Sequence, residues 1–321
     1  MLQETKNINN PNFSTGFFGK LSGFTDFIKY KAAGKEILTI DNWIQEGLAL
    51  AKLKYKNQWK NYYDSLSSIN FVYPFTGTDS TTIGVITPGN DKSGRSFPFI
   101  MFSNIKKNIN DDLSFYLLPY AFKDLFYSFD EIVESNKMIE DTSGLKSLID
   151  NLKLYQISHA LVINDYKKFI SENRLSDFYS LGNENNLNLK EYFKNNLKIF
   201  EHFICFSCST ELNNPNNSFI ICYCIQLLQK VFKNSDIQPG IYWMQLDDKS
   251  WLLYLTFTKP TPKDFIDLLF YDRTLLMTSE DNSNENKKDF YTGDSLIRDN
   301  SIISGNLSLN EFLNSIRNYL N

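Results

Sequence analysis

Residues 71–102 read FVYPFTGTDSTTIGVITPGNDKSGRSFPFIMF. Three runs in this stretch, 71–75, 82–87 and 97–102, are rich in β-branched and aromatic residues. Two segments rich in Gly, Asp, Asn and Pro separate them. Such runs favour strands and such segments favour turns, so the stretch predicts three consecutive strands joined by turns.

The segments outside this stretch add helices and more strands. From Asp41 to Tyr62 apolar residues recur at helical spacing with no proline before Pro74, which predicts one long amphipathic helix. Further helices are predicted at 111–128 with a kink near Pro119, at 142–155, 189–203 and 218–232, and through Phe265; further strands are predicted at 160–163, 241–246 and 251–258. The alternation predicts an α/β fold, with a central mixed or antiparallel sheet flanked by helices on both faces as a three-layer sandwich.

The order of these elements suggests two halves packed into one globular unit. We expect an N-terminal half at 14–130 and a C-terminal α/β half at 131–278. Residues 1–13 are polar and expected to fray, and 279–296 are expected to form a flexible loop. In the tail, 297–321, Ser308 and Glu311 form a capping box that opens a terminal helix, which is expected to dock on the body.

Composition excludes several classes of function. The net charge is -4 and the pI is about 5.4, with no basic stripe to bind a phosphate backbone, so no nucleic-acid partner is expected. The N-terminus has no apolar signal region and the apolar runs are too short to span a bilayer. We therefore expect a cytoplasmic protein without membrane insertion, in which the four cysteines stay reduced.

Residues 89–96 resemble a phosphate-binding loop, with Arg95 where that loop has Lys. A phosphate-binding loop must open a helix whose N–H groups point at the anion. Here Phe97-Pro98-Phe99-Ile100 continues as a predicted strand, so nucleotide binding is not expected. No cofactor is predicted.

The four cysteines and two histidines are the candidates for a metal or catalytic site. With His202 nearby, the spacing superficially resembles a zinc site, but every Cys has bulky apolar neighbours, which favours buried structural thiols and no metal. Neither His159 nor His202 lies in a nucleophile motif. The cysteines are Cys205, Cys208, Cys222 and Cys224.

Two aspartates leave an enzymatic alternative open. Asp26 and Asp91 could work as paired acids with Arg95, because such pairs need proximity only in space. The structural interpretation, in which Asp26 caps a helix or turn and Asp91 closes a turn after Asn90, is favoured.

Two motifs stand out beyond the periodicity. The first is Gly16-Phe17-Phe18-Gly19-Lys20-Leu21 with Asp26-Phe27 close behind, and the second is Asp91-Lys92-Ser93-Gly94-Arg95-Ser96-Phe97-Pro98. In this order they resemble the first two motifs of the TagF family of type VI secretion accessory proteins. Weaker similarity follows at Trp43, Gly47, Leu48, 240–243 and 259–269. The resemblance therefore covers most of residues 14–270.

The chain also departs from the family pattern. Where the family usually has Leu-Pro and a Gly before the Asp, this chain has Leu21-Ser22-Gly23-Phe24-Thr25-Asp26. A late Gly-Leu-Pro is replaced by Thr258-Lys259-Pro260, and nothing beyond Tyr271 resembles the family. Any function placed in the tail is therefore unsupported by the resemblance.

The resemblance implies a non-enzymatic, post-translational repressor of type VI secretion that binds other proteins. Its implied partners are cytoplasmic type VI secretion proteins, including the forkhead-associated scaffold protein of the threonine-phosphorylation pathway. A structural subunit of the secretion machine is the remaining alternative. The candidate binding surface comprises Gly16, Phe17, Phe18, Gly19, Lys20, Asp26, Asp91, Gly94, Arg95 and Pro98.

The residue types of the motifs predict specific geometry. Gly16 and Gly19 permit positive φ or close approach of another segment, and the two phenylalanines supply apolar area for the core or for a partner. The Arg95 guanidinium can pair with Asp26 or Asp91 and so tie the two motif loops together.

Overall fold

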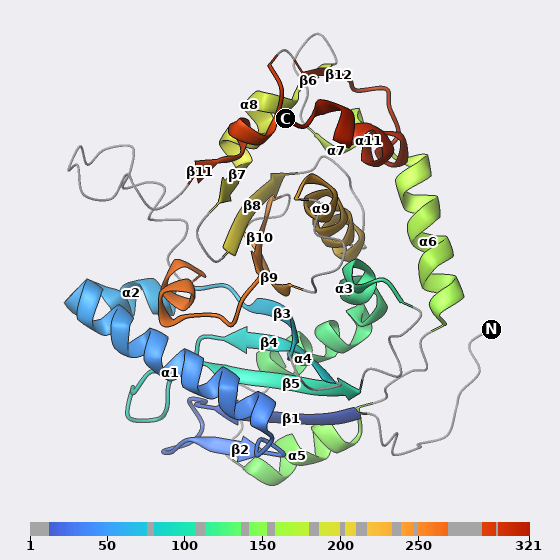
Figure 1. Ribbon diagram of the computed structural model, residues 1–321. Helices are drawn as coiled ribbons and strands as arrows, with labels where there is room; N and C mark the ends of the chain where they lie inside the picture. Colours follow the sequence, from blue (N-terminus) through green and yellow to red (C-terminus); the bar gives the residue numbers. More distant parts are fainter. Residues whose placement is uncertain are drawn as a thin grey trace. The chain divides into compact units, whose positions relative to one another are not determined.

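In the computed structural model (Figure 1), the chain folds into two compact units. The first comprises Met1–Asp112, Phe122–Ile157 and Pro260–Tyr271, and the second comprises Leu113–Ala121, Ser158–Lys259 and Asp272–Asn321. The division falls at different points from the boundaries expected at 130 and 278, because the chain passes between the units repeatedly. The structure describes residues 13–75, 80–106, 113–135, 141–152, 158–179, 186–199, 203–209, 217–232, 239–246, 250–268, 291–299 and 301–321.

The first unit contains an antiparallel sheet in the order β3-β4-β5-β1-β2. Its strands are β1 Phe13–Gly19, β2 Ile28–Tyr30, β3 Ile69–Pro74, β4 Ser80–Thr87 and β5 Phe99–Lys106. The three strands predicted in 71–102 are confirmed as β3, β4 and β5. β5 begins after Pro98, not at Phe97, since proline has no N–H to donate to a neighbouring strand.

Helices cover both faces of this sheet, as predicted. On one face Phe17 lies opposite Tyr30, whose hydroxyl donates to Asp150 at the end of α5. On the other face Ser80 donates to Glu36 in the first turn of α1. Figure 1 shows α1 in front of the strands and α4 and α5 behind them. The helices are α1 Lys35–Tyr55, η1 Lys56–Gln58, α2 Trp59–Asp64, α4 Lys123–Ser135 and α5 Thr142–Asp150.

Two predicted helices of this region are interrupted. The helix predicted at 41–62 begins at Lys35 and stops at Lys56, whose φ of 47° cannot continue an α-helix. The helix predicted at 111–128 is also wrong as one element. It is replaced by η3 Phe115–Leu117 and α3 Leu118–Ala121 in the second unit, followed by α4 in the first. The predicted helix at 142–155 corresponds to the shorter α5.

A late segment returns to the first unit and packs on α1. Residues 262–268 are helical, as predicted around Phe265. The Trp43 indole N–H donates to the Thr261 carbonyl at 2.7 Å, and its ring meets Phe265 edge to face. A Cβ on Gly47 would lie 2.4 Å from the Phe265 ring, so a glycine is required at this crossing.

The second unit contains an antiparallel sheet in the order β11-β7-β8-β10-β9. The predicted strand pair is confirmed as β9 and β10, and the predicted helix at 218–232 is confirmed as α9. The strands are β7 Leu197–Ile199, β8 Phe203–Ser209, β9 Gly240–Gln245, β10 Ser250–Thr256 and β11 Tyr291–Thr292; a separate pair joins β6 Asn186–Asn188 to β12 Ile302–Ser304. The helices are α6 His159–Glu172, α7 Leu175–Phe178, α8 Leu189–Asn196, α9 Asn217–Val231 and α11 Leu309–Ser315, with η4 Gly293–Leu296 and η5 Ile316–Tyr319.

Two predictions in this unit are wrong. Residues 160–163 belong to helix α6, because Ser158 caps its N-terminus and the buried residues Val162, Tyr166 and Phe169 follow helical spacing. The helix predicted at 189–203 ends at Asn196, and the chain continues into strands β7 and β8.

The C-terminal tail packs as predicted. Ser308 and Glu311 form a reciprocal capping box at the start of α11, and Phe312 is fully buried where α11 contacts α6. Of the loop expected at 279–296, residues 279–290 lie outside the described part of the chain, whereas 291–296 form β11 and η4. Of the expected frayed N-terminus, residues 1–12 also lie outside it, and Phe13 begins β1.

Candidate functional site

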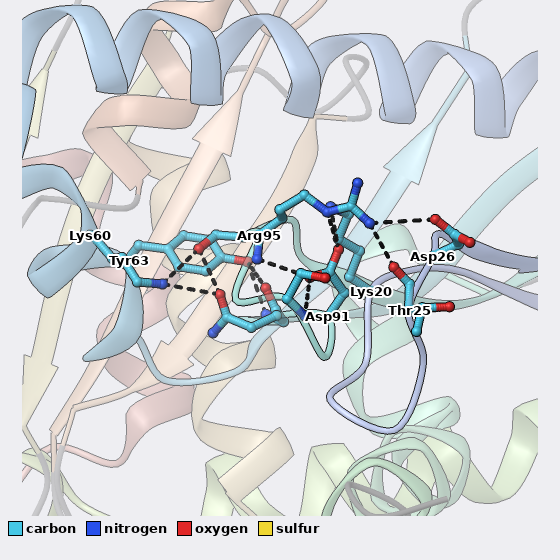
Figure 2. A network of polar contacts seen from close by, with 11 residues as sticks. Lys20, Thr25, Asp26, Lys60, Tyr63, Asp91 and Arg95 are labelled. Atoms are coloured by element: carbon cyan, nitrogen blue, oxygen red, sulfur yellow. Dashed lines mark hydrogen bonds and ion pairs between the residues drawn. The ribbon is translucent and has the colours of Figure 1, made fainter. Parts of the chain in front are cut away.

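Two loops of the first unit carry most of the charged motif residues. Loop 20–27 connects β1 to β2, and loop 88–98 connects β4 to β5. The Lys92 backbone N–H donates to the Phe24 carbonyl at 2.8 Å, and the Phe27 and Phe97 rings meet edge to face at 5.2 Å. We call these segments the paired loops. Figure 2 shows their polar contacts.

The buried Asp91 carboxylate accepts hydrogen bonds from residues of both paired loops. Its Oδ1 accepts hydrogen bonds from the backbone N–H groups of Ser93 and Arg95, which closes the turn predicted after Asn90. Its Oδ2 accepts from Lys20 Nζ at 2.9 Å and Arg95 Nε at 2.7 Å. The carboxylate is fully buried, and each oxygen accepts two hydrogen bonds.

The electrostatics of Asp91 follow from these contacts. Burial by itself would raise the pKa of the Asp91 carboxyl, but the hydrogen bonds from Lys20 and Arg95 lower this pKa well below its ordinary value. The same carboxylate raises the pKa of Arg95. The Asp91 carboxylate is therefore ionised at neutral pH.

Arg95 makes the predicted tie between the loops, and its two partners are unequal. Besides Asp91, its Nη2 donates to the Thr25 carbonyl at 2.6 Å and approaches Asp26 Oδ1 at 3.4 Å (Figure 2). The Asp26 side chain is 85% exposed, so solvent weakens that pair. Arg95 therefore connects the two loops mainly through Asp91 and the Thr25 carbonyl.

The glycines of the motifs are required by close approach and backbone conformation. Gly19 has a φ of 129°, and a Cβ there would lie 2.1 Å from the Pro98 carbonyl oxygen. A Cβ on Gly16 would lie 2.3 Å from the Tyr30 carbonyl oxygen. Gly94 has a φ of 75° in the turn after Asp91, with open space around it. Gly19 and Pro98 therefore bring the ends of the paired loops together.

The two phenylalanines of the first motif lie in the core. Successive residues of β1 face opposite sides of the sheet, so Phe17 packs on Tyr30 and Phe99 while Phe18 packs on Phe102. Both side chains are almost completely buried. They can affect a binding surface through the fold but do not lie on it.

Helix α2 contributes residues that the sequence interpretation did not include. The Tyr63 hydroxyl donates to the Gly89 carbonyl and accepts from the Gly89 N–H, and its burial raises its pKa. Lys60 Nζ donates to Asn90 and Ser96 in the same loop. Lys60 and Tyr63 are three residues apart, which places their side chains on the same face of a helix. This spacing is the sequence feature from which their shared contact with the loop could have been predicted.

The cysteine cluster lies in the second unit. Cys205 and Cys208 are on β8 and Cys222 and Cys224 on α9, all four buried as free thiols. Burial raises the pKa of Cys222 and Cys224, which makes these thiols poor nucleophiles. His202 lies outside the described residues. Within the described ranges, no group of three or more His, Cys, Asp or Glu side chains could hold a metal ion.

The charged atoms at the paired loops suit structural pairing better than chemistry. A general base needs a pKa near the working pH, and the pKa of Asp91 is displaced in the opposite direction. Thr25, Asp26, Phe27 and Arg95 form the exposed edge of the paired loops, where a partner could make contact.

In the described part of the chain, no helix is long and apolar enough to cross a membrane.

Comparison with known proteins agrees with the motifs. Residues 16–153 match the family described as TagF N-terminal domain, Type VI secretion system-associated. Among solved structures, the crystal structure of PA0076 from Pseudomonas aeruginosa PAO1 is similar, with 14% identity and a TM-score of 0.48, over 80% of this chain and 94% of that chain. No curated protein matches the chain.

The matched segment includes β2 to β5, β1 from Gly16 onward, and both paired loops. The protein is therefore of the class that carries a type VI secretion-associated domain. Residues 16–153 are therefore identified as a TagF N-terminal domain.

Proposed function

We propose that this protein is a non-enzymatic regulator that represses type VI secretion by binding a partner protein in the cytoplasm. The observation that supports binding is the exposed edge of the paired loops, Thr25, Asp26, Phe27 and Arg95, which rests on the buried Asp91. A surface that is already ordered loses less conformational entropy on binding than a flexible loop. A forkhead-associated scaffold protein of the secretion system is the first partner to test.

The geometry gives little support to an enzyme built on Asp26, Asp91 and Arg95. Both oxygens of Asp91 are saturated by hydrogen bonds, and its lowered pKa makes it a weak base. The exposed Asp26 is one partner of Arg95 and is surrounded by solvent, without the burial that is typical of a catalytic acid.

The test is a secretion assay in the native host. Deleting the gene should increase the amount of secreted tube protein in the medium, and the wild-type gene should restore repression. Phe27→Ser and Asp26→Arg should each fail to restore it, since both change the exposed edge. Leu148→Ser is the matched control, because Leu148 on α5 is as exposed (40%) as Phe27 (39%) and lies away from the paired loops.

Folding is monitored in each variant by thermal unfolding of the purified protein. Asp26→Arg is the decisive variant, since a side chain that is 85% exposed can be replaced without disturbing the core. Secretion that does not change, or falls, on deletion contradicts repression. A folded Asp26→Arg variant that represses as well as wild type, together with an equally effective Phe27→Ser, places the contact surface elsewhere.

A further inference from the structure

A second surface of the first unit has a different chemistry from the paired loops. Where α1 ends, Lys52, Leu53, Lys54 and Lys56 are all exposed, and we call this set the basic corner. Residues 47–63 contain four lysines and no Asp or Glu, in a chain whose net charge is -4. Figure 1 shows this corner where α1 turns into α2. The local charge is therefore opposite to that of the whole protein.

The lysines of the basic corner are not neutralised by carboxylates within the described structure. Lys52 Nζ lies 4.8 Å above the Trp59 ring centroid, and Lys54 Nζ lies 5.3 Å from the Tyr55 ring centroid. Among the described residues, no acidic side chain forms an ion pair with Lys52, Lys54 or Lys56. The aromatic rings position two of the ammonium groups while leaving them accessible.

Stabilisation of the helix explains only part of this arrangement. Lysines in the last turn interact favourably with the C-terminal end of the helix dipole, which accounts for Lys52 and Lys54. It does not account for Leu53, whose side chain is 75% exposed among these lysines. Leu50, one turn earlier, is 37% exposed.

The backbone conformation of Lys56 also indicates a role for its side chain beyond folding. Its φ of 47° and ψ of -121° lie in a region that glycine adopts without strain and a β-carbon disfavours, while its N–H caps the helix by donating to the Lys52 carbonyl. Glycine would serve this cap better than lysine. Backbone strain of this kind is typical of positions whose side chain has a role other than folding.

We propose that the basic corner is a docking site for an acidic segment of a partner protein that also carries a leucine-like apolar side chain. The lysines match carboxylates, and Leu53 with Leu50 matches the apolar side chain. Nucleic acid would leave the leucines unmatched, and two leucines are too few to anchor a helix in a membrane. The negative charge of the rest of the chain would also repel an extended polyanion, but a short acidic segment only touches the corner.

The test measures fluorescence anisotropy of a labelled peptide made of Glu-Glu-Leu repeats with the full-length protein. Binding is expected, and it should weaken by about tenfold or more in the double variant Lys54→Glu with Lys56→Glu, and as salt is raised. Peptides made of Gln-Gln-Leu and Glu-Glu-Ser repeats should each bind more weakly, because each lacks one of the two features. The matched control is Lys29→Glu with Lys35→Glu, which reverses two exposed lysines elsewhere in the same unit and should leave binding unchanged.

Lys56→Gly separates docking from folding. It should raise the thermal unfolding midpoint by removing strain while weakening peptide binding by several-fold, a combination that a purely structural role cannot produce. The proposal is overturned by a peptide that does not bind, by equal loss of binding in the control pair, or by stronger binding to phosphatidylserine vesicles or duplex DNA than to the peptide. Each of these outcomes is independent of the secretion assay.

Discussion

Lys20 Nζ and Arg95 Nε approach the same oxygen of Asp91, at 2.9 and 2.7 Å, from residues 71 positions before it and four positions after it. One buried anion thereby holds two cations from different loops. A buried charge costs free energy unless it is paired and hydrogen-bonded, so the three side chains depend on one another.

Asp91→Asn is expected to lower the midpoint of thermal unfolding much more than Asp26→Asn. Asparagine leaves the two cations without a buried counter-charge, whereas Asp26 is 85% exposed and its pair with Arg95 is screened by water. The measurement is thermal unfolding at neutral pH followed by circular dichroism. Equal shifts in the two variants would contradict the assignment of Asp91 as the centre of the network.

Lowering the pH should reduce the difference in the midpoint of thermal unfolding between the wild-type protein and Asp91→Asn. Because the pKa of Asp91 is lower in the folded protein, its stabilisation is fully present above the ordinary pKa of Asp, near 3.9, and is lost as pH falls below it. Midpoints of thermal unfolding of the two proteins, measured from neutral pH to about pH 3, should converge toward the acid end. A gap that is constant with pH would exclude a role for the charge.

Gly19 and Gly94 should differ in their tolerance of asparagine. Gly19→Asn is expected to destabilise the protein by about 3 kcal/mol or more, because a Cβ would meet the Pro98 carbonyl oxygen and the φ of 129° is strained. Gly94→Asn should cost roughly 1 kcal/mol or less, since asparagine tolerates positive φ and no atom lies near. Urea unfolding of both variants tests this ordering, and a reversed ordering would refute it.

Gly47→Ala should destabilise the protein although alanine is the better helix former. Its Cβ would lie 2.4 Å from Phe265, and overpacking of this kind costs about 1–3 kcal/mol. In a Phe265→Ala background the same change should cost less, because the contacts with the Phe265 ring are removed and the contact with the Cβ of residue 265, 2.6 Å away, remains. A double-mutant cycle in urea measures the coupling, and an additive result would mean that the two residues do not touch.

Asp130 on α4 should make stability depend on pH in the opposite direction from Asp91. Burial, assisted by Glu134, raises the pKa of Asp130 to about 6. The folded protein therefore keeps a proton that the unfolded chain releases between about pH 4 and 6, and Asp130 lowers stability as pH rises through this window.

Asp130→Asn is accordingly expected to stabilise the protein at neutral pH by about 1–2 kcal/mol, after allowance for solvent screening, and to have little effect near pH 4. Urea unfolding at the two pH values measures both effects. Glu131→Gln, at an exposed position of the same helix, is the control and should show a smaller change at either pH. The same shift in both variants would indicate a general charge effect on α4.

Local sequence was sufficient for several elements. The turn residues between the runs in 71–102 identified β3, β4 and β5, because Gly permits turn conformations, Pro fixes φ and Asp hydrogen-bonds to the nearby backbone, all without help from distant residues. The capping box of Ser308 and Glu311 likewise located the start of α11, since both partners lie within one turn. The Arg95 tie was predicted from chemistry, although the sequence alone left Asp26 and Asp91 as alternatives.

Other features depended on contacts between distant residues. A short apolar run such as 160–163 fits a strand or a helix equally well, and packing of Val162 and Tyr166 with the rest of α6 decided for the helix. Periodicity also continued through Lys56, where the backbone turns and α1 ends.

The sequence by itself determined strands β3, β4 and β5 of the first sheet, the capping of α11 and the two motifs of the TagF N-terminal domain, because each depends on residues close together in the chain. Tertiary structure decided that Phe17 and Phe18 are core residues, and that Lys20 meets Asp91 below the paired loops. It also brought Phe265 back onto Gly47. Burial and pairing between distant residues are properties of the packed chain, and no local pattern encodes them.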